Sequence, residues 1–108
     1  MFNLFKRPKI LTFKDLFFTE DEISKSARFT LVSQILTDEQ RNLFNEMLNM
    51  RSARIEFSNG YFISVKLGTM FHSNAVDTYE VYSNLDRTYL DYATSEEITE
   101  FMIKIQNA

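Results

Sequence analysis

The chain has 108 residues, the usual length of one domain, and nothing in it suggests a second domain. Its residues are 44% hydrophobic and 25% charged, which is enough apolar material for a core and argues against intrinsic disorder. It has no cysteine, so disulfides, thiolate chemistry and cysteine-ligated zinc are excluded, and a reducing cytoplasm is favoured. No apolar run approaches the roughly 20 residues of a membrane span, and no signal-peptide stretch follows the first positive charges, so we expect a single cytoplasmic domain over residues 1–108.

The net charge of -3 is unevenly distributed along the chain. Residues 1–54 carry nine basic and seven acidic side chains, whereas residues 55–108 carry three and eight, which gives net charges of +2 and -5. Between Asp77 and Glu100, seven acidic residues are opposed only by Arg87. Such an asymmetry steers charged partners toward one part of a surface.

The first residues form a short basic stretch, and we expect residues 1–10 to be a flexible basic arm. Phe5 and Phe13 lie beside its charges, and nucleic-acid-binding proteins combine cations with aromatic side chains that stack on bases. The alternative is that the apolar residues of this stretch, Leu11, Phe13, Leu16 and Phe17, dock on the core. The cations that would serve nucleic-acid binding are Lys6, Arg7, Lys9 and Lys14.

Three segments carry the capping-box pattern, in which a hydroxyl residue is followed three positions later by Glu or Gln. They are Thr19–Glu22, Thr37–Gln40 and Thr94–Glu97, and each predicts a helix start. The helix after Thr37 is expected to reach about Met50, and the last helix has an apolar face of Ile98, Phe101, Met102 and Ile105. The run after Thr19 also fits a strand over residues 28–32, although its spacing favours a helix.

Strand patterns fill the region between these helices. Residues 54–58 alternate between apolar and polar side chains, and residues 61–67 do so again after Asn59-Gly60, the strongest short signal for a two-residue hairpin turn. We therefore expect Asn59 and Gly60 both to have positive φ. Further strands are predicted at residues 78–83 and 88–92.

This order predicts an α+β fold, with N-terminal helices, an antiparallel β-meander of three to four strands and a C-terminal helix packed on the sheet. The predicted core is Leu43, Phe44, Met47, Ile55, Phe57, Ile63, Val65, Val81, Ile98, Phe101 and Ile105.

The residues that carry chemistry do not form a recognised catalytic pattern. His72 is the only histidine, and although Ser73 and Asp77 lie nearby in sequence, we interpret His72 as a polar loop residue. The carboxylates around Asp21 are explained by helix capping, and Asp86 and Asp91 by solvent exposure, so we predict no metal site. With only two glycines the chain has no phosphate-binding loop, and no cofactor or enzymatic activity is predicted.

The outward face of the predicted sheet carries aromatic residues that need a cover. The chain's own helices are one candidate, and a symmetric homodimer is another, since one apolar patch can bury its own copy. The predicted partner-binding residues are Phe62, Met70, Phe71, Glu80, Tyr82, Asp86 and Asp91.

The second half resembles small uncharacterised bacteriophage-encoded proteins in three stretches: residues 58–65, 79–82 and 92–98. The resemblance implies a non-enzymatic phage accessory or host-takeover protein in the host cytoplasm, which binds and modulates a host or phage protein. A basic, nucleic-acid-handling or defence protein is the expected target, because an acidic patch complements it. The alternatives are a nucleic-acid-binding module that uses the basic N-terminal arm and a small structural subunit of a virion.

Overall fold

The computed structural model describes residues 9–31, 37–68 and 71–108, and it confirms the α+β fold. The chain order is a one-turn 3₁₀ helix (Phe13–Asp15), β1 (Thr19–Glu20), α1 (Glu22–Leu31), α2 (Asp38–Leu48), β2 (Arg51–Glu56), β3 (Phe62–Leu67), β4 (Thr78–Ser83), β5 (Thr88–Thr94) and α3 (Ser95–Gln106). The five strands form one antiparallel sheet in the order of the sequence.

The helix expected from Thr19 begins later than its capping-box pattern predicted. Thr19 and Glu20 instead form the edge strand β1, which pairs with Ser52 and Arg51 of β2 and makes a fifth strand. The first turn of α1 is capped by Asp21, whose side chain accepts a hydrogen bond from the Ile23 amide at 2.9 Å. The two-residue strand satisfies backbone groups on the otherwise free edge of β2, which a longer helix would leave without partners.

The other two capping boxes are confirmed. The Thr94 hydroxyl accepts from the Glu97 amide at 3.2 Å, and the Glu97 carboxylate accepts from the Thr94 amide at 3.0 Å. Thr37 and Gln40 exchange the same pair of bonds at 3.2 and 2.9 Å. Each box satisfies two amides that the first turn of a helix leaves without partners.

The hairpin between β2 and β3 is confirmed, but its loop has three residues rather than two. The Phe57 amide donates to the Tyr61 carbonyl, and the Gly60 amide donates to the Phe57 carbonyl. Gly60 has φ 89°, whereas Asn59 is not among the described residues with positive φ. This is the type I turn followed by a left-handed glycine. The Asn59 side chain instead donates to the Ile105 carbonyl at the end of α3.

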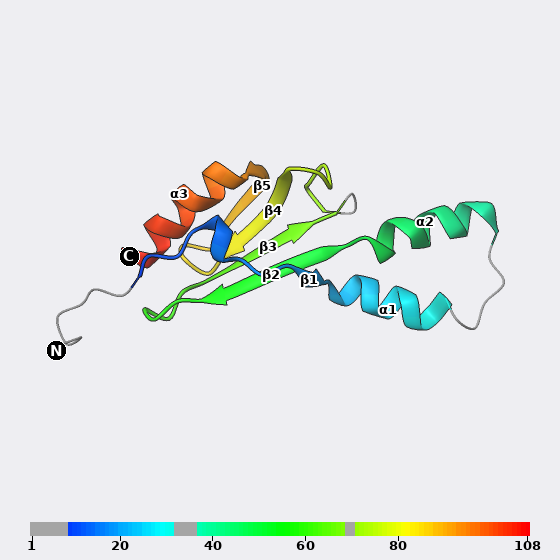
Figure 1. Ribbon diagram of the computed structural model, residues 1–108, viewed down its shortest axis with the longest axis horizontal. Helices are drawn as coiled ribbons and strands as arrows, with labels where there is room; N and C mark the ends of the chain where they lie inside the picture. Colours follow the sequence, from blue (N-terminus) through cyan, green and yellow to red (C-terminus); the bar gives the residue numbers. More distant parts are fainter. Residues whose placement is uncertain (1–8, 32–36, 69–70) are drawn as a thin grey trace.

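The core lies between the inner face of the sheet and α3 (Figure 1). The N-terminal segment packs along one edge of this core, where Gln106 of α3 exchanges two hydrogen bonds with the backbone of Leu11. The predicted strand alternation is confirmed: Ile63, Val65 and Val81 are fully buried. The core residues are Phe57, Ile63, Val65, Val81, Leu85, Ala93, Ile98, Phe101, Met102 and Ile105, with Ile55 packed against them.

The helices α1 and α2 pack against each other as a helical hairpin that extends past the end of the sheet (Figure 1). They therefore cover neither face of it. Leu43, predicted to lie in the core, is 49% exposed for this reason, and Met47 is only half-buried. The side chain of Phe44 lies outside the described residues.

Candidate functional site

The face of the sheet opposite α3, called here the outer face, carries Phe62 and Tyr82, the aromatic residues that the sequence pattern predicted to point outward. A shallow groove of about 360 Å³ crosses β2 to β5 on this face. Its lining residues are Arg54, Phe62, Ser64, Lys66, Glu80, Tyr82 and Tyr89. A second groove continues it toward β1 and shares Arg54, Ser64 and Lys66 with the first.

An aromatic row runs across three adjacent strands of the outer face. The ring centroids of Phe62 and Tyr82 lie 5.7 Å apart, and those of Tyr82 and Tyr89 lie 4.6 Å apart. The Arg54 guanidinium lies 3.8 Å from the centroid of the Phe62 ring and pairs with Glu56. Tyr89 at the end of the row is 68% exposed. Tyrosine, phenylalanine and arginine are the residues in which protein interfaces are enriched.

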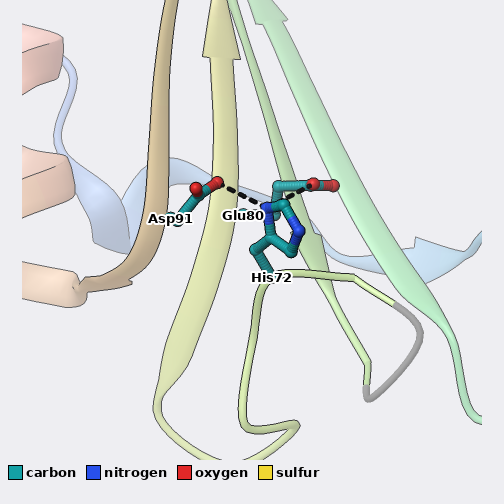
Figure 2. Close-up of side chains that lie close together, drawn as sticks. All are labelled: His72, Glu80 and Asp91. Carbon is teal, nitrogen blue, oxygen red and sulfur yellow. Dashed lines mark hydrogen bonds and ion pairs between the residues drawn. The ribbon is translucent and has the colours of Figure 1, made fainter.

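Beside this row, His72, Glu80 and Asp91 converge (Figure 2). The His72 Nδ1 atom lies 2.8 Å from Asp91 Oδ1 and 3.6 Å from Glu80 Oε1. The three residues come from the β3–β4 loop, β4 and β5. Glu80 is the most sheltered, with 28% of its side chain exposed, against 61% for His72 and 53% for Asp91.

A β-bulge in β5 brings Tyr92 to this cluster beside Asp91. Val81 pairs with Leu90 and Tyr79 pairs with Ala93, so that Asp91 and Tyr92 together face the single residue Glu80. Tyr92 has φ 52°, a left-handed conformation that is uncommon for a bulky residue. Its amide donates to the His72 carbonyl at 2.9 Å, and its ring stacks on the His72 ring with centroids 6.1 Å apart.

The loop that carries His72 is held by its own polar side chains. The buried Ser73 hydroxyl donates to the Thr78 carbonyl at 2.6 Å and accepts from the Ala75 amide at 2.9 Å. The Asn74 side chain accepts from the amides of Val76, Asp77 and Thr78. Ser73 is thus a structural residue of the loop and has no hydrogen bond with His72 among the described contacts.

The electrostatics of the cluster favour a charged imidazole. The hydrogen bond and charge of Asp91 raise the pKa of His72 above its usual 6.5, and the charge of Glu80 acts in the same direction. Lys66, the cross-strand neighbour of Glu80, is directed elsewhere: its Nζ lies 3.9 Å from Asp21 and 5.1 Å from the centroid of the Phe71 ring.

The structure brings together four of the predicted partner-binding residues, Phe62, Glu80, Tyr82 and Asp91, on the outer face. Phe71 is half-buried beneath Lys66 rather than free on the surface. Asp86 is exposed in the turn between β4 and β5, away from the cluster. Met70 lies outside the described residues.

The cations proposed for nucleic-acid binding are not brought together as one described patch. Lys9 pairs with Asp15 at 3.4 Å, and Lys14 lies in a shallow groove with Glu96 and Glu100. Lys6 and Arg7 lie outside the described residues.

The sequence interpretation missed His72, Tyr89 and Tyr92 as site residues. For Tyr89 the signal was present, because alternation along residues 88–92 places it on the same face as the outward residues of β4. For His72 and Tyr92 there was no such signal, since a loop conformation and a bulge position them.

Comparison with protein families, with curated proteins and with solved structures finds no match to this chain. Among the described residues, no helix is long and apolar enough to cross a membrane.

Proposed function

We propose that this protein is a non-enzymatic accessory protein that acts by protein–protein contact through the outer face of its sheet. The observation that carries the proposal is the aromatic row of Phe62, Tyr82 and Tyr89, which lies on a sheet face that no described helix covers. Aromatic residues at the centre of a surface with charged residues around them are typical of protein interfaces. The phage-accessory role implied by the sequence resemblance is compatible with action through contact alone.

A protein partner fits this face better than a nucleic acid does. Nucleic-acid-binding surfaces carry many cations, because the neutralisation of phosphates by Lys and Arg supplies most of the non-specific affinity. The outer face has Arg54 and Lys66, but each already pairs with a carboxylate, Glu56 and Asp21 respectively. Glu80 and Asp91 add two further negative charges on the same face.

The partner that the charges indicate first is a second copy of this chain. The cations Arg54 and Lys66 lie on β2 and β3, whereas the acids Glu80 and Asp91 lie on β4 and β5. A two-fold axis parallel to the strands, between β3 and β4, sets Arg54 and Lys66 of one copy opposite Glu80 and Asp91 of the other, so that each cation gains a second carboxylate beside its own partner, Glu56 or Asp21. Such an interface is self-complementary, as a two-fold dimer requires.

The size of the face sets the expected affinity. With strands about 4.8 Å apart and about 3.3 Å per residue, the face formed by the four longer strands, β2 to β5, measures roughly 19 by 20 Å. That is below the roughly 800 Å² per partner of a standard interface, so the expected dimer dissociates in the micromolar range.

Sedimentation velocity between about 1 and 200 μM tests the proposal, since this range brackets a micromolar dissociation constant. The wild type should shift from monomer to dimer, and Phe62→Glu should remain monomeric, because it places a desolvated charge at the centre of the interface. Leu43→Glu is the control: it also replaces an apolar side chain by Glu, but one that is 49% exposed on α2, away from the outer face, and should dimerise normally.

Circular dichroism of the three proteins establishes that each is folded. A wild type that stays monomeric over the whole range, or a Phe62→Glu variant that dimerises like the wild type, contradicts the proposal.

A further inference from the structure

We propose that His72, Glu80 and Asp91 form a binding site for a divalent transition-metal ion, and that Zn²⁺ fits their ligand set well. The proposal concerns the cluster at the edge of the outer face (Figure 2) and does not rest on self-association through the aromatic row. It assigns to His72 a role other than that of a polar loop residue.

The spacing of the ligand atoms matches that around a single ion. With metal–ligand bonds of about 2.1 Å, two ligand atoms on one ion lie about 3.0 Å apart at a right angle and about 3.4 Å apart at the tetrahedral angle. The distances from His72 Nδ1 to the carboxylate oxygens, 2.8 Å to Asp91 and 3.6 Å to Glu80, lie on either side of these values. All three ligand atoms lie within 4.8 Å of one another. Only small side-chain movements separate this arrangement from a coordinating one.

A cation satisfies the three groups better than the single proton on Nδ1 does. One N–H donates to one acceptor at full strength, and here that acceptor is Asp91. Glu80, at 3.6 Å, is beyond hydrogen-bond distance and gains only electrostatic attraction. A divalent ion in place of the proton bonds to all three atoms and balances the two carboxylate charges against its own.

The donor set discriminates between cations. Calcium and magnesium prefer all-oxygen ligands, whereas zinc readily combines an imidazole nitrogen with carboxylate oxygens. His72 and Asp91 are more than half exposed, so the remaining coordination positions face solvent and take water. Three protein ligands with an open position are a common arrangement for zinc.

The backbone around the cluster is fixed before any ion binds. Asp91 lies opposite Glu80 across β4 and β5, and the bulge turns Tyr92 outward, where its amide and its stacked ring hold His72. A ligand whose orientation is already set loses less conformational entropy on binding. Lys66 pairs with Asp21, so among the described ion pairs Lys66 does not compete with a metal ion for Glu80.

Isothermal titration of tag-free protein with ZnCl₂ is the test, because His72 is the only histidine of the chain and a histidine tag would conceal it. The variants are His72→Ala, Glu80→Gln and Asp91→Asn, of which the last two keep the shape of the side chain and remove its charge. Asp86→Asn is the matched control, since it removes an exposed carboxylate outside the cluster. The imidazole proton resonances give a second readout that belongs to one residue.

We expect one Zn²⁺ per chain, a shift of the His72 resonances on binding, and a loss of affinity of at least about tenfold in each cluster variant, in line with what disturbed metal sites lose. Asp86→Asn should bind like the wild type, and CaCl₂ or MgCl₂ at the same concentration should produce no comparable heat. Phe62→Glu should also keep its zinc affinity, so that failure of the dimer proposal and failure of this one are distinguishable. Absence of zinc binding overturns the proposal, as does binding that Glu80→Gln and Asp91→Asn leave unchanged, because a lone surface histidine then accounts for it.

Discussion

Replacing Ser24 by alanine tests how the helical hairpin is joined to the sheet. Ser24 is fully buried in α1, and its hydroxyl lies against the backbone of Met50, the residue just before β2. The hydroxyl accepts from the Met50 amide at 3.0 Å and lies within donor distance of the carbonyls of Met47 and Met50. It is the main side-chain link between α1 and the start of the sheet among the described contacts.

The expected cost follows from what each backbone group retains after the change. The Met50 amide keeps a longer bond to the Met47 carbonyl at 3.3 Å, and the Met50 carbonyl keeps the Asp21 amide at 3.1 Å. The variant therefore loses two buried hydrogen bonds, worth about 1 kcal/mol each, without leaving a fully orphaned group. Alanine favours the helix over serine by up to about 0.5 kcal/mol, which offsets part of the loss. We expect a net decrease of about 1.5 kcal/mol in the free energy of unfolding.

Urea unfolding followed by circular dichroism measures this decrease by linear extrapolation. Lys25→Ala is the control, because it also introduces alanine into α1, one residue along, but removes only an exposed ion pair with Glu22, worth less than about 0.5 kcal/mol. Hydrogen exchange should show faster exchange of the α1 amides in Ser24→Ala than in Lys25→Ala. If the two variants unfold within 0.5 kcal/mol of each other, a resolution set by typical additivity errors of about that size, the link through Ser24 is not a determinant of stability.

Two further predictions concern α3 and the cluster. Thr94→Ala should lower the free energy of unfolding by about 1 kcal/mol, because it removes the capping bond from the Glu97 amide. Thr94→Ser keeps the hydroxyl and should lose much less stability. Equal losses for the two variants in urea unfolding would argue against the cap. In metal-free buffer, the pKa of His72 from NMR titration should lie above 6.5 and fall toward 6.5 in Asp91→Asn. Because the folded-state pKa is the higher one, this pair stabilises the fold fully below the unfolded-state pKa, and the stabilisation is lost as pH rises through the folded-state value. A His72 pKa at or below 6.5 in the wild type would refute the ion pair.

The parts of the fold that depend on local interactions were predictable from the sequence. The boxes at Thr37 and Thr94 each involve atoms three residues apart, and the strands after Arg54 show their buried side by simple alternation. The pattern at Thr19 was equally good locally, but the free edge of β2 recruited Thr19 and Glu20 as a strand. A sequence pattern does not record which distant edge needs a partner.

The placement of the helical hairpin was not predictable for a related reason. Apolar spacing along residues 38–48 indicates a helix with one apolar stripe, but it does not say what the stripe contacts. In the structure α2 packs on α1 beyond the sheet, and Leu43 is half exposed. The outer face is left without a helical cover for the same reason, which is why a partner surface is proposed there.

The packing around His72 depends on one extra residue in β5. In a regular strand that began with Tyr89 outward and Leu90 inward, Asp91 would point outward, Tyr92 inward and Ala93 outward. The bulge leaves Asp91 outward, turns Tyr92 outward as well and returns Ala93, which is 3% exposed, to the core. Asp91 and Tyr92 are thereby both available to His72, one through its carboxylate and the other through its ring and amide. The left-handed backbone at Tyr92 is energetically unfavourable and persists only where its surroundings fix it. Bulges and strained residues of this kind are frequent beside functional sites. The same distortion thus places Tyr92 beside His72. Alternation alone puts Glu80 and Asp91 on the outer face, but it could not have located the loop and the bulge that hold His72 against them.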